Sequence, residues 1–258
     1  VKVYLHHPIE GYPADVDIIC SRNGFGKNEY IQTFKPIVVV TAPGPNSGKL
    51  STCLSQLYHE HLLDINAGYA KFETFPIWNL PLKHPVNIAY EAATADICDF
   101  NLVDPFHLSE YDITAVNYNR DVESFPILKL IISRIMAGKK LKMPMYNSPT
   151  DMGVNREGFG ITDDDVVRKA GMQELIRRYF RYNTEYIMGL EKKETVDRVA
   201  LLMEELGVKV TDRKVVNIAR KSAEEAEICG KGNAGIFCGA ALEFKDGRIV
   251  TGKNSKLM

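Results

Sequence analysis

Two periodicities of apolar residues, one typical of strands and one of helices, predict alternating strands and helices in the first half of the chain. Alternating or continuous apolar positions predict strands over residues 1–5, 17–20, 37–41, 68–74 and 115–118. Helical spacing predicts helices over residues 47–63 and 87–95. Residues 37–41 are all β-branched, which is typical of a strand buried on both faces. The alternation favours an α/β fold with a parallel or mixed sheet.

Helical spacing dominates the second half of the chain. It predicts helices over residues 125–135, 162–186, 195–206 and 212–229, and the last two stop at Gly207 and Gly230. From residue 235 two strand-like runs flank the turn at Asp246-Gly247, which predicts a β-hairpin. We therefore expect an α/β domain over 1–124, a helical domain or insertion over 125–230, and the start of a truncated α+β domain over 231–258.

Composition narrows the class of protein. The chain has 258 residues, 45% hydrophobic content and a net charge of −1, which argues against binding nucleic acid or acidic membranes by bulk charge. Its 5 scattered cysteines form no Cys-x-x-Cys pair and predict reduced, mostly packed thiols in a cytoplasmic protein. No apolar run reaches the roughly 18 residues of a membrane span. The chain starts without methionine and ends just after a strand-like run, so we expect a fragment of a longer protein.

A candidate phosphate-binding loop lies between the predicted strand 37–41 and the helix that follows it. The loop is rich in glycine and proline and ends in Gly48-Lys49. Backbone N–H groups at the start of a helix, together with a lysine, suit a phosphate anion. The predicted phosphate-binding residues of this loop are Gly44, Asn46, Ser47, Gly48, Lys49 and Ser51.

The loop departs from the strict nucleotide-binding pattern at two positions. Pro43 stands where that pattern has glycine, and Leu50 stands where it has the Ser or Thr that holds Mg²⁺. The hydroxyl of Ser51 comes one residue later and points about 100° away on a helix. Anion binding is therefore favoured over Mg²⁺-assisted hydrolysis of a nucleoside triphosphate. The alternative is a structural turn with a solvated Lys49.

Three further polar segments could complete a site with Lys49. Glu73 shares a predicted strand face with Lys71, and the alternative there is a surface ion pair. Arg120 lies in a loop of amides, acids and arginine, and a similar loop over 151–156 contains Asp151 and Arg156, with internal capping as the alternative. We expect these segments and Lys49 to line one cleft. Arg120 and Arg156 are the added phosphate-binding candidates, and the catalytic candidates are Lys49, Glu73, Asp151 and Arg156.

The sequence identifies no cofactor and no metal site. His59 and His61 are two residues apart, whereas a zinc-binding helix needs a spacing of four. Histidines near a helix C-terminus, where the helix dipole favours them, are the simpler interpretation.

Long strings of residues resemble an uncharacterised bacterial family called domain of unknown function 1846. The strings are VVTAPGPNSGK at 39–49, YAKFETFPIWNLPLKHPV at 69–86, and the segments 116–123, 148–156 and 230–255. Members are about twice this length, so the resemblance implies that an N-terminal segment and most of a C-terminal domain lie outside this sequence. It implies a fold more than a function. Some relatives carry an old label of zinc protease, but this sequence contains no zinc-ligand motif that would support the label.

Residues 238–255 also resemble the opening hairpin of the cytidine-deaminase fold. In that fold the asparagine end of the hairpin contributes to the substrate pocket, and the zinc-binding His-x-Glu and Cys-x-x-Cys would follow later. The likeness supports a deaminase-like fold more than a deaminase activity.

The combined prediction is a cytoplasmic protein that binds a nucleotide or a phosphorylated metabolite, with phosphoryl transfer or hydrolysis left open. A non-catalytic scaffold or regulatory protein is the first alternative. A nucleobase-processing enzyme, working through the deaminase-like domain, is the second. The expected partner is a small phosphorylated ligand, neither nucleic acid nor membrane, and a homo-oligomer is left open.

Overall fold

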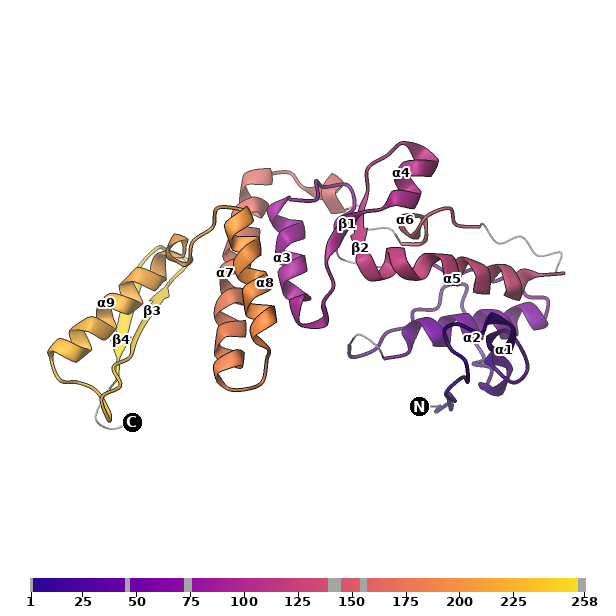
Figure 1. Ribbon diagram of the computed structural model, residues 1–258, viewed down its shortest axis with the longest axis horizontal. Helices are drawn as coiled ribbons and strands as arrows, with labels where there is room; N and C mark the ends of the chain where they lie inside the picture. The colour runs from indigo at the N-terminus through magenta and orange to yellow at the C-terminus, as the bar shows by residue number, and fades with distance from the viewer. Residues whose placement is uncertain (1, 45–46, 72–75, 139–144, 154–156, 255–258) are drawn as a thin grey trace. The chain divides into compact units, whose positions relative to one another are not determined.

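The computed structural model describes residues 2–44, 47–71, 76–138, 145–153 and 157–254 (Figure 1). The chain divides into two compact units. Unit 1 comprises Val1–Leu82 and Asp99–Gly160, and unit 2 comprises Lys83–Cys98 and Ile161–Met258. These divisions differ from the three consecutive segments predicted at 1–124, 125–230 and 231–258, because residues 83–98 pack with the second half of the chain.

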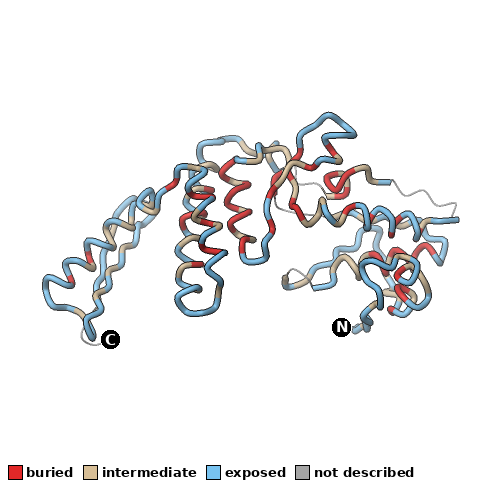
Figure 2. The backbone as a smooth tube through the Cα atoms, viewed as in Figure 1, coloured by how far each residue is buried: buried red, intermediate tan, exposed pale blue. Residues whose placement is uncertain are grey.

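Helices α2 (Lys49–Leu62) and α5 (Asn119–Met136) build the core of unit 1. The buried residues of α5 recur every three or four positions, so they form one apolar side (Figure 2). This side packs with buried residues of α2, of α1 (Val16–Ile19) and of the 3₁₀ turn η1 (Phe25–Lys27). The central members of this core are Ile19, Phe25, Leu54, Leu57, Phe125, Leu128 and Ile132.

A short antiparallel sheet and two short helices complete the described part of unit 1. Strand β1 (Asn101–Val103) pairs with β2 (Val116–Tyr118), with Asn101 opposite Tyr118 and Val103 opposite Val116. Helix α4 (Pro105–Tyr111) connects these two strands, and α6 (Pro149–Met152) packs against α4. The strand predicted at 115–118 is thus confirmed, and β2 leads directly into α5.

The described residues do not form the parallel or mixed sheet predicted for the first half. Both of their ladders are antiparallel, and the one parallel pairing is an isolated bridge between Lys71 and Gly153. Residues 37–41 form no strand, although their β-branched side chains favour one, because no neighbouring strand among the described residues pairs with them. Residues 2–5 form no strand either. Residues 17–20, predicted as a strand, lie in and beside α1, whose start is capped by the Asp15 carboxylate.

Unit 2 contains a three-helix core and a helix that packs on a hairpin. The core is formed by α3 (Pro85–Ala93), α7 (Asp164–Ile187) and α8 (Lys193–Glu205), with Ile88, Leu175 and Val199 among its buried residues. Helix α9 (Lys214–Ile228) packs on the antiparallel strands β3 (Gly239–Glu243) and β4 (Ile249–Lys253). The predicted helices of this half are confirmed to within two residues, apart from α5 of unit 1, which begins six residues early.

At two glycines of unit 2 the backbones of neighbouring elements come into close contact. A Cβ atom on Gly171 of α7 would lie 2.7 Å from the backbone of Pro85 in α3. A Cβ atom on Gly239 of β3 would lie 2.1 Å from the carbonyl oxygen of Ala219 in α9. The predicted hairpin is therefore confirmed, and it packs tightly on α9. A deaminase-like fold stays a prediction.

Candidate functional site

The loop before α2 gathers several hydrogen-bond donors. Gly48 is the N-cap of α2 and has a φ of 83°, a left-handed conformation that glycine adopts without strain. No side chain among the described residues caps the first turn, which leaves N–H groups of that turn without an intrahelical acceptor. The Lys49 ammonium donates to the carbonyl oxygen of Gly44 at 2.7 Å, and the Ser47 hydroxyl donates to the same oxygen at 2.6 Å. Ser51 lies in the same turn, and Asn46 lies outside the described residues.

A second set of polar contacts joins three distant segments of unit 1. The Lys71 ammonium forms an ion pair with the Asp121 carboxylate in the first turn of α5. The backbone N–H of Lys71 donates to the carbonyl oxygen of Met152 at 2.7 Å, beside the bridge to Gly153. The structure thus brings the Lys71 segment, the start of α5 and the end of α6 together. The predicted neighbour Glu73 lies outside the described residues.

Arg120 is held by a buried acid. Its guanidinium lies 2.8 Å from a carboxylate oxygen of Asp99, whose side chain is only 4% exposed, while the Arg120 side chain is 43% exposed. The pair balances the charge of Asp99 and leaves part of the guanidinium in solvent. Arg156, the other predicted phosphate-binding arginine, lies outside the described residues.

Asp151 serves as a capping residue in the described structure. It forms a capping box with Ser148 at the start of α6. One carboxylate oxygen accepts from the Tyr111 hydroxyl at 2.9 Å and from the backbone N–H groups of Asn147 and Ser148 at 3.0 and 3.1 Å. The hydrogen bond to Asp151 also raises the pKa of Tyr111. These contacts fasten α6 to α4, in keeping with the capping alternative.

A buried polar network that was not predicted from the sequence lies between α4 and α6. One oxygen of Asp104 accepts from the Thr150 hydroxyl at 2.6 Å, and the other accepts from the backbone of Phe106 and His107. The ring Nδ1 of His107 lies 2.9 Å from the Ser148 hydroxyl. Pro105 and Pro149 each follow a capping residue directly, and that pattern is a helix-start signal legible in the sequence.

This network lacks the geometry of a nucleophilic triad. The Ser148 residue is 0% exposed, so a substrate has no access to its hydroxyl. A triad histidine uses one ring nitrogen for the nucleophile and the other for the acid. Here the same Nδ1 of His107 faces both Ser148, at 2.9 Å, and Asp151, at 3.7 Å. The network is therefore a structural one.

The predicted cleft residues have different partners in the described structure. Lys49 contacts the Gly44 carbonyl, Arg120 contacts Asp99, and Asp151 contacts the capping donors. Glu73 and Arg156 fall outside the described residues. A single cleft lined by all five stays a prediction.

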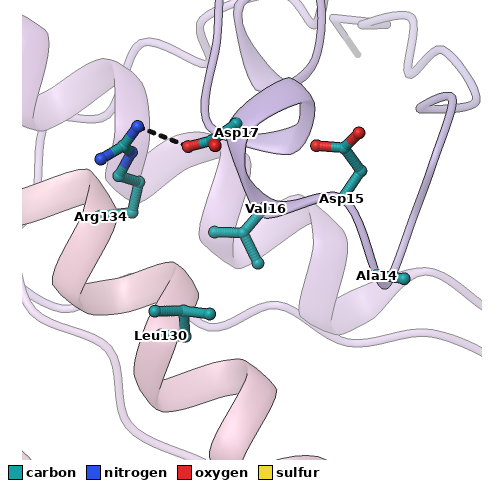
Figure 3. Close-up of a pocket in the computed structure, with 6 residues that line it drawn as sticks. All are labelled: Ala14, Asp15, Val16, Asp17, Leu130 and Arg134. Carbon is teal, nitrogen blue, oxygen red and sulfur yellow. Dashed lines mark hydrogen bonds and ion pairs between the residues drawn. The ribbon is translucent and has the colours of Figure 1, made fainter.

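A shallow surface hollow lies elsewhere in unit 1, between α1 and α5 (Figure 3). It has a volume of about 590 Å³ and is open to solvent. Its lining includes the ion pair between Asp17 and Arg134, together with Asp15, which caps α1. None of the predicted site residues lines it, so it adds nothing to the candidate site.

The histidines and cysteines of the described residues show no metal-binding arrangement. His59 Nε2 lies 2.8 Å from the carbonyl oxygen of Asn28, and His61 Nε2 lies 3.0 Å from that of Ala67. No group of three His, Cys, Asp or Glu side chains in the described ranges is placed to share an ion.

The expectation of mostly packed thiols is wrong for three of the five cysteines, since Cys98, Cys229 and Cys238 are exposed.

The described residues thus form a helix-rich fold with two small antiparallel sheets and a glycine-containing loop before α2. Residues 1–207 match the family described as "Domain of unknown function DUF1846, N-terminal", and the chain belongs to this family. None of the helices in the described ranges has the length and apolar character needed to cross a bilayer.

Curated relatives align along the entire chain. A UPF0371 protein of Fusobacterium nucleatum is 59% identical over 100% of this chain and 51% of its own length. A UPF0371 protein of Clostridium botulinum strain Eklund 17B is 58% identical, and one of Clostridium tetani is 57% identical, each over 100% of this chain and 50% of the relative. The chain therefore spans about half the length of the curated relatives it matches.

Proposed function

We propose that residues 44–49 and the first turn of α2 bind the phosphate group of a nucleotide or a small phosphorylated metabolite. The observation that carries this proposal is the set of donors at one place: an uncapped helix N-terminus, the Lys49 ammonium and the Ser47 hydroxyl. Helix N-termini attract anions through their N–H groups and their dipole. Lys49 adds a full positive charge.

Ligand binding would exchange one acceptor for another. Lys49 and Ser47 both donate to the neutral carbonyl oxygen of Gly44 in the described structure. A phosphate oxygen carries negative charge and forms stronger, charge-assisted hydrogen bonds with the same donors. Arg120 lies in the first turn of α5 with a partly exposed side chain, and it remains a candidate for a second phosphate contact together with Arg156. Phosphoryl transfer or hydrolysis would need residues beyond this loop.

The Lys49 ammonium provides the direct test. We expect Lys49→Ala to weaken binding of ADP or pyrophosphate by about 1.5–3 kcal/mol, the usual worth of a charge-assisted hydrogen bond. Isothermal titration calorimetry measures this difference. Lys27→Ala removes an exposed lysine of η1 and serves as the matched control, with unchanged binding. If Lys49→Ala bound these ligands as tightly as the wild type, the loop would be only a turn.

Position 50 separates binding from metal-assisted chemistry. Leu50 occupies the place at which Mg²⁺-dependent loops carry a hydroxyl, so wild-type binding should not require Mg²⁺. Leu50→Ser should make binding depend on Mg²⁺. Titrations with Mg²⁺ and with a chelator test this, and a wild-type protein that binds only with Mg²⁺ would contradict it.

A non-catalytic scaffold is the second candidate, and one observation favours it. The predicted site residues Arg120 and Asp151, and also Lys71, already have partners within unit 1. Groups satisfied in this way position loops without any ligand. If the wild-type chain bound none of the phosphate compounds, this interpretation would take the lead.

A further inference from the structure

Four consecutive apolar residues of unit 1 are exposed to solvent. Ile37, Val38, Val39 and Val40 are 81%, 53%, 82% and 37% exposed. Isolated exposed apolar residues are ordinary on a protein surface, but a continuous run of β-branched residues is not. Such a run is typical of a strand that is buried on both faces.

The backbone of the same run also forms no ladder with a described strand. No backbone hydrogen bond connects residues 37–41 to any other described residue. Strands obtain these bonds from neighbouring strands, on two edges when the strand is central. The segment thus lacks two features that its sequence predicts, namely burial of its apolar side chains and backbone hydrogen bonds to neighbouring strands.

Two residues that flank this segment at some distance along the chain, Ile31 and Lys49, are attached to α2 or belong to it. The side chain of Gln56 accepts from the backbone N–H of Ile31 at 3.1 Å and donates to its carbonyl oxygen at 2.9 Å. At the other end the chain enters α2 at Lys49. The exposed run therefore belongs to a longer stretch of chain that α2 holds at Ile31 and at Lys49.

The relatives indicate what could cover this segment. They carry about as much polypeptide again outside the part that aligns with this chain. We propose that residues 37–41 form a central strand of a sheet whose other strands come from that further polypeptide. A second copy of this chain fits less well, because self-pairing of one segment supplies a single neighbouring strand and leaves the other edge bare. The proposal goes beyond phosphate binding and does not depend on it.

Hydrogen–deuterium exchange on two proteins tests the proposal. One is the 258-residue chain, and the other is the whole-length Fusobacterium nucleatum relative with its aligned part replaced by this chain. In the chain alone, amides 37–41 should exchange as fast as unstructured peptide. In the hybrid they should exchange on the order of 100-fold more slowly, since paired core strands open rarely. Equally fast exchange in both proteins would overturn the proposal.

Two substitutions sharpen the result. Val39→Asp should leave the melting temperature of the chain alone within about 2 °C, because an exposed side chain contributes little to stability. In the hybrid it should abolish the slow exchange at 37–41. Ile187→Asp, at an equally exposed residue of α7 in unit 2, should leave that exchange unchanged. Protection that survives Val39→Asp would contradict a paired strand.

Two further measurements cover the cases in which the hybrid does not fold or the chain forms a dimer. If the hybrid does not fold, the same exchange experiment on the relative itself, with and without aspartate at the position aligned with Val39, answers the question. Light scattering on the chain alone tests for a second copy, and a dimer that protects residues 37–41 would overturn the proposal. Lys49→Ala should change phosphate binding without changing exchange at 37–41, so the two proposals can fail separately.

Discussion

His84 joins two helices of unit 2 through both nitrogens of its ring. The residue is 2% exposed, Nδ1 accepts from the backbone N–H of Val86 at 3.3 Å, and Nε2 lies 2.9 Å from a carboxylate oxygen of Asp164. Because Nδ1 is the acceptor, the ring proton on Nε2 is donated to Asp164. We expect His84→Ala to lower the free energy of unfolding by about 2 kcal/mol, which urea denaturation measures.

An asparagine at this position separates the two contacts. Asparagine is a favoured N-cap residue, so His84→Asn should restore the bond to Val86 and recover about 1 kcal/mol of the loss. It is too short to reproduce the contact with Asp164. Equal stability of the alanine and asparagine variants would mean that the cap contributes nothing.

Individual side chains were predictable only where their partners are close in sequence. Asp104 and Ser148 each precede a proline and cap the helix that follows, so their roles are legible from neighbouring residues. For Lys71 the sequence offered a surface ion pair with Glu73 as the alternative, and the described structure shows an ion pair between Lys71 and Asp121. That partner lies 50 positions away, and no local pattern connects the two residues.

Gly171 sets how closely α3 and α7 approach. An added Cβ atom would lie 2.7 Å from the carbonyl carbon and oxygen of Pro85, and backbone atoms cannot rotate away as a side chain can. We expect Gly171→Ala to lower the free energy of unfolding by about 1–3 kcal/mol, despite the better helix propensity of alanine. Gly252→Ala, on β4 where an added Cβ meets nothing within 4 Å, is the matched control. A Gly171→Ala variant as stable as this control would show that the helices can separate freely.

Glu174 makes the stability of α7 depend on pH. The hydrogen bond from Arg177 has the largest effect and lowers the pKa of this carboxyl below its ordinary value of 4.5. Burial acts in the opposite direction, and the hydrogen bond from Arg178 lowers the pKa further. The lowered pKa means that the unfolded state takes up the proton first as the pH falls. The stabilisation is therefore complete above pH 4.5 and is lost as the pH falls through the folded-state pKa.

Glu174→Gln should reveal this dependence in thermal melts. The variant should melt below the wild type at neutral pH, and the difference should shrink below pH 4.5 as the wild-type carboxyl is protonated. Glu224→Gln, at an exposed carboxyl of α9, provides the reference. A difference that stayed constant from pH 7 to about pH 3 would contradict the linkage.

Helices were predicted far better than strands because a helix satisfies its own backbone. Each of α3, α7, α8 and α9 carries an apolar stripe that fixes its place in the sequence, and their ends came within two residues. A strand depends on neighbours that a single segment does not reveal. Residues 37–41 have strand-like side chains without a described partner, whereas 116–118 have β1 beside them.

The described residues form two separate apolar cores, one in each unit, and a cavity in one core should leave the other intact. Leu54 belongs to the core of unit 1 and Leu175 to that of unit 2, and both are 0% exposed. We expect Leu54→Ala and Leu175→Ala each to cost about 2–5 kcal/mol. Hydrogen exchange should speed up in α2 and α5 for the first variant and in α3, α7 and α8 for the second. Equal acceleration in both units for either variant would mean that the chain unfolds as one cooperative body.

The division into units could not be derived from the sequence. Residues 83–98 follow directly on residues 1–82, and the alternation of predicted strands and helices continues through them, so they were assigned to the domain over 1–124. Their place is decided by α3, whose Ile88 and Ala92 pack in a core with Leu175 and Val199. Apolar spacing shows that a helix has a buried face, but it does not say which distant helix will cover that face.

The path of the chain between its units has a consequence for synthesis on the ribosome. The chain leaves unit 1 after Leu82, returns at Asp99 and leaves again after Gly160. Helix α3 therefore emerges well before α7, the helix that covers it. The ribosome adds about 5–20 residues per second, so the apolar side of α3 stays uncovered for several seconds until α7 has been synthesised. The same arrangement limits how the chain can be truncated. A chain that ends at Gly160 would contain α3 without α7, and a chain that begins at Ile161 would contain α7 without α3.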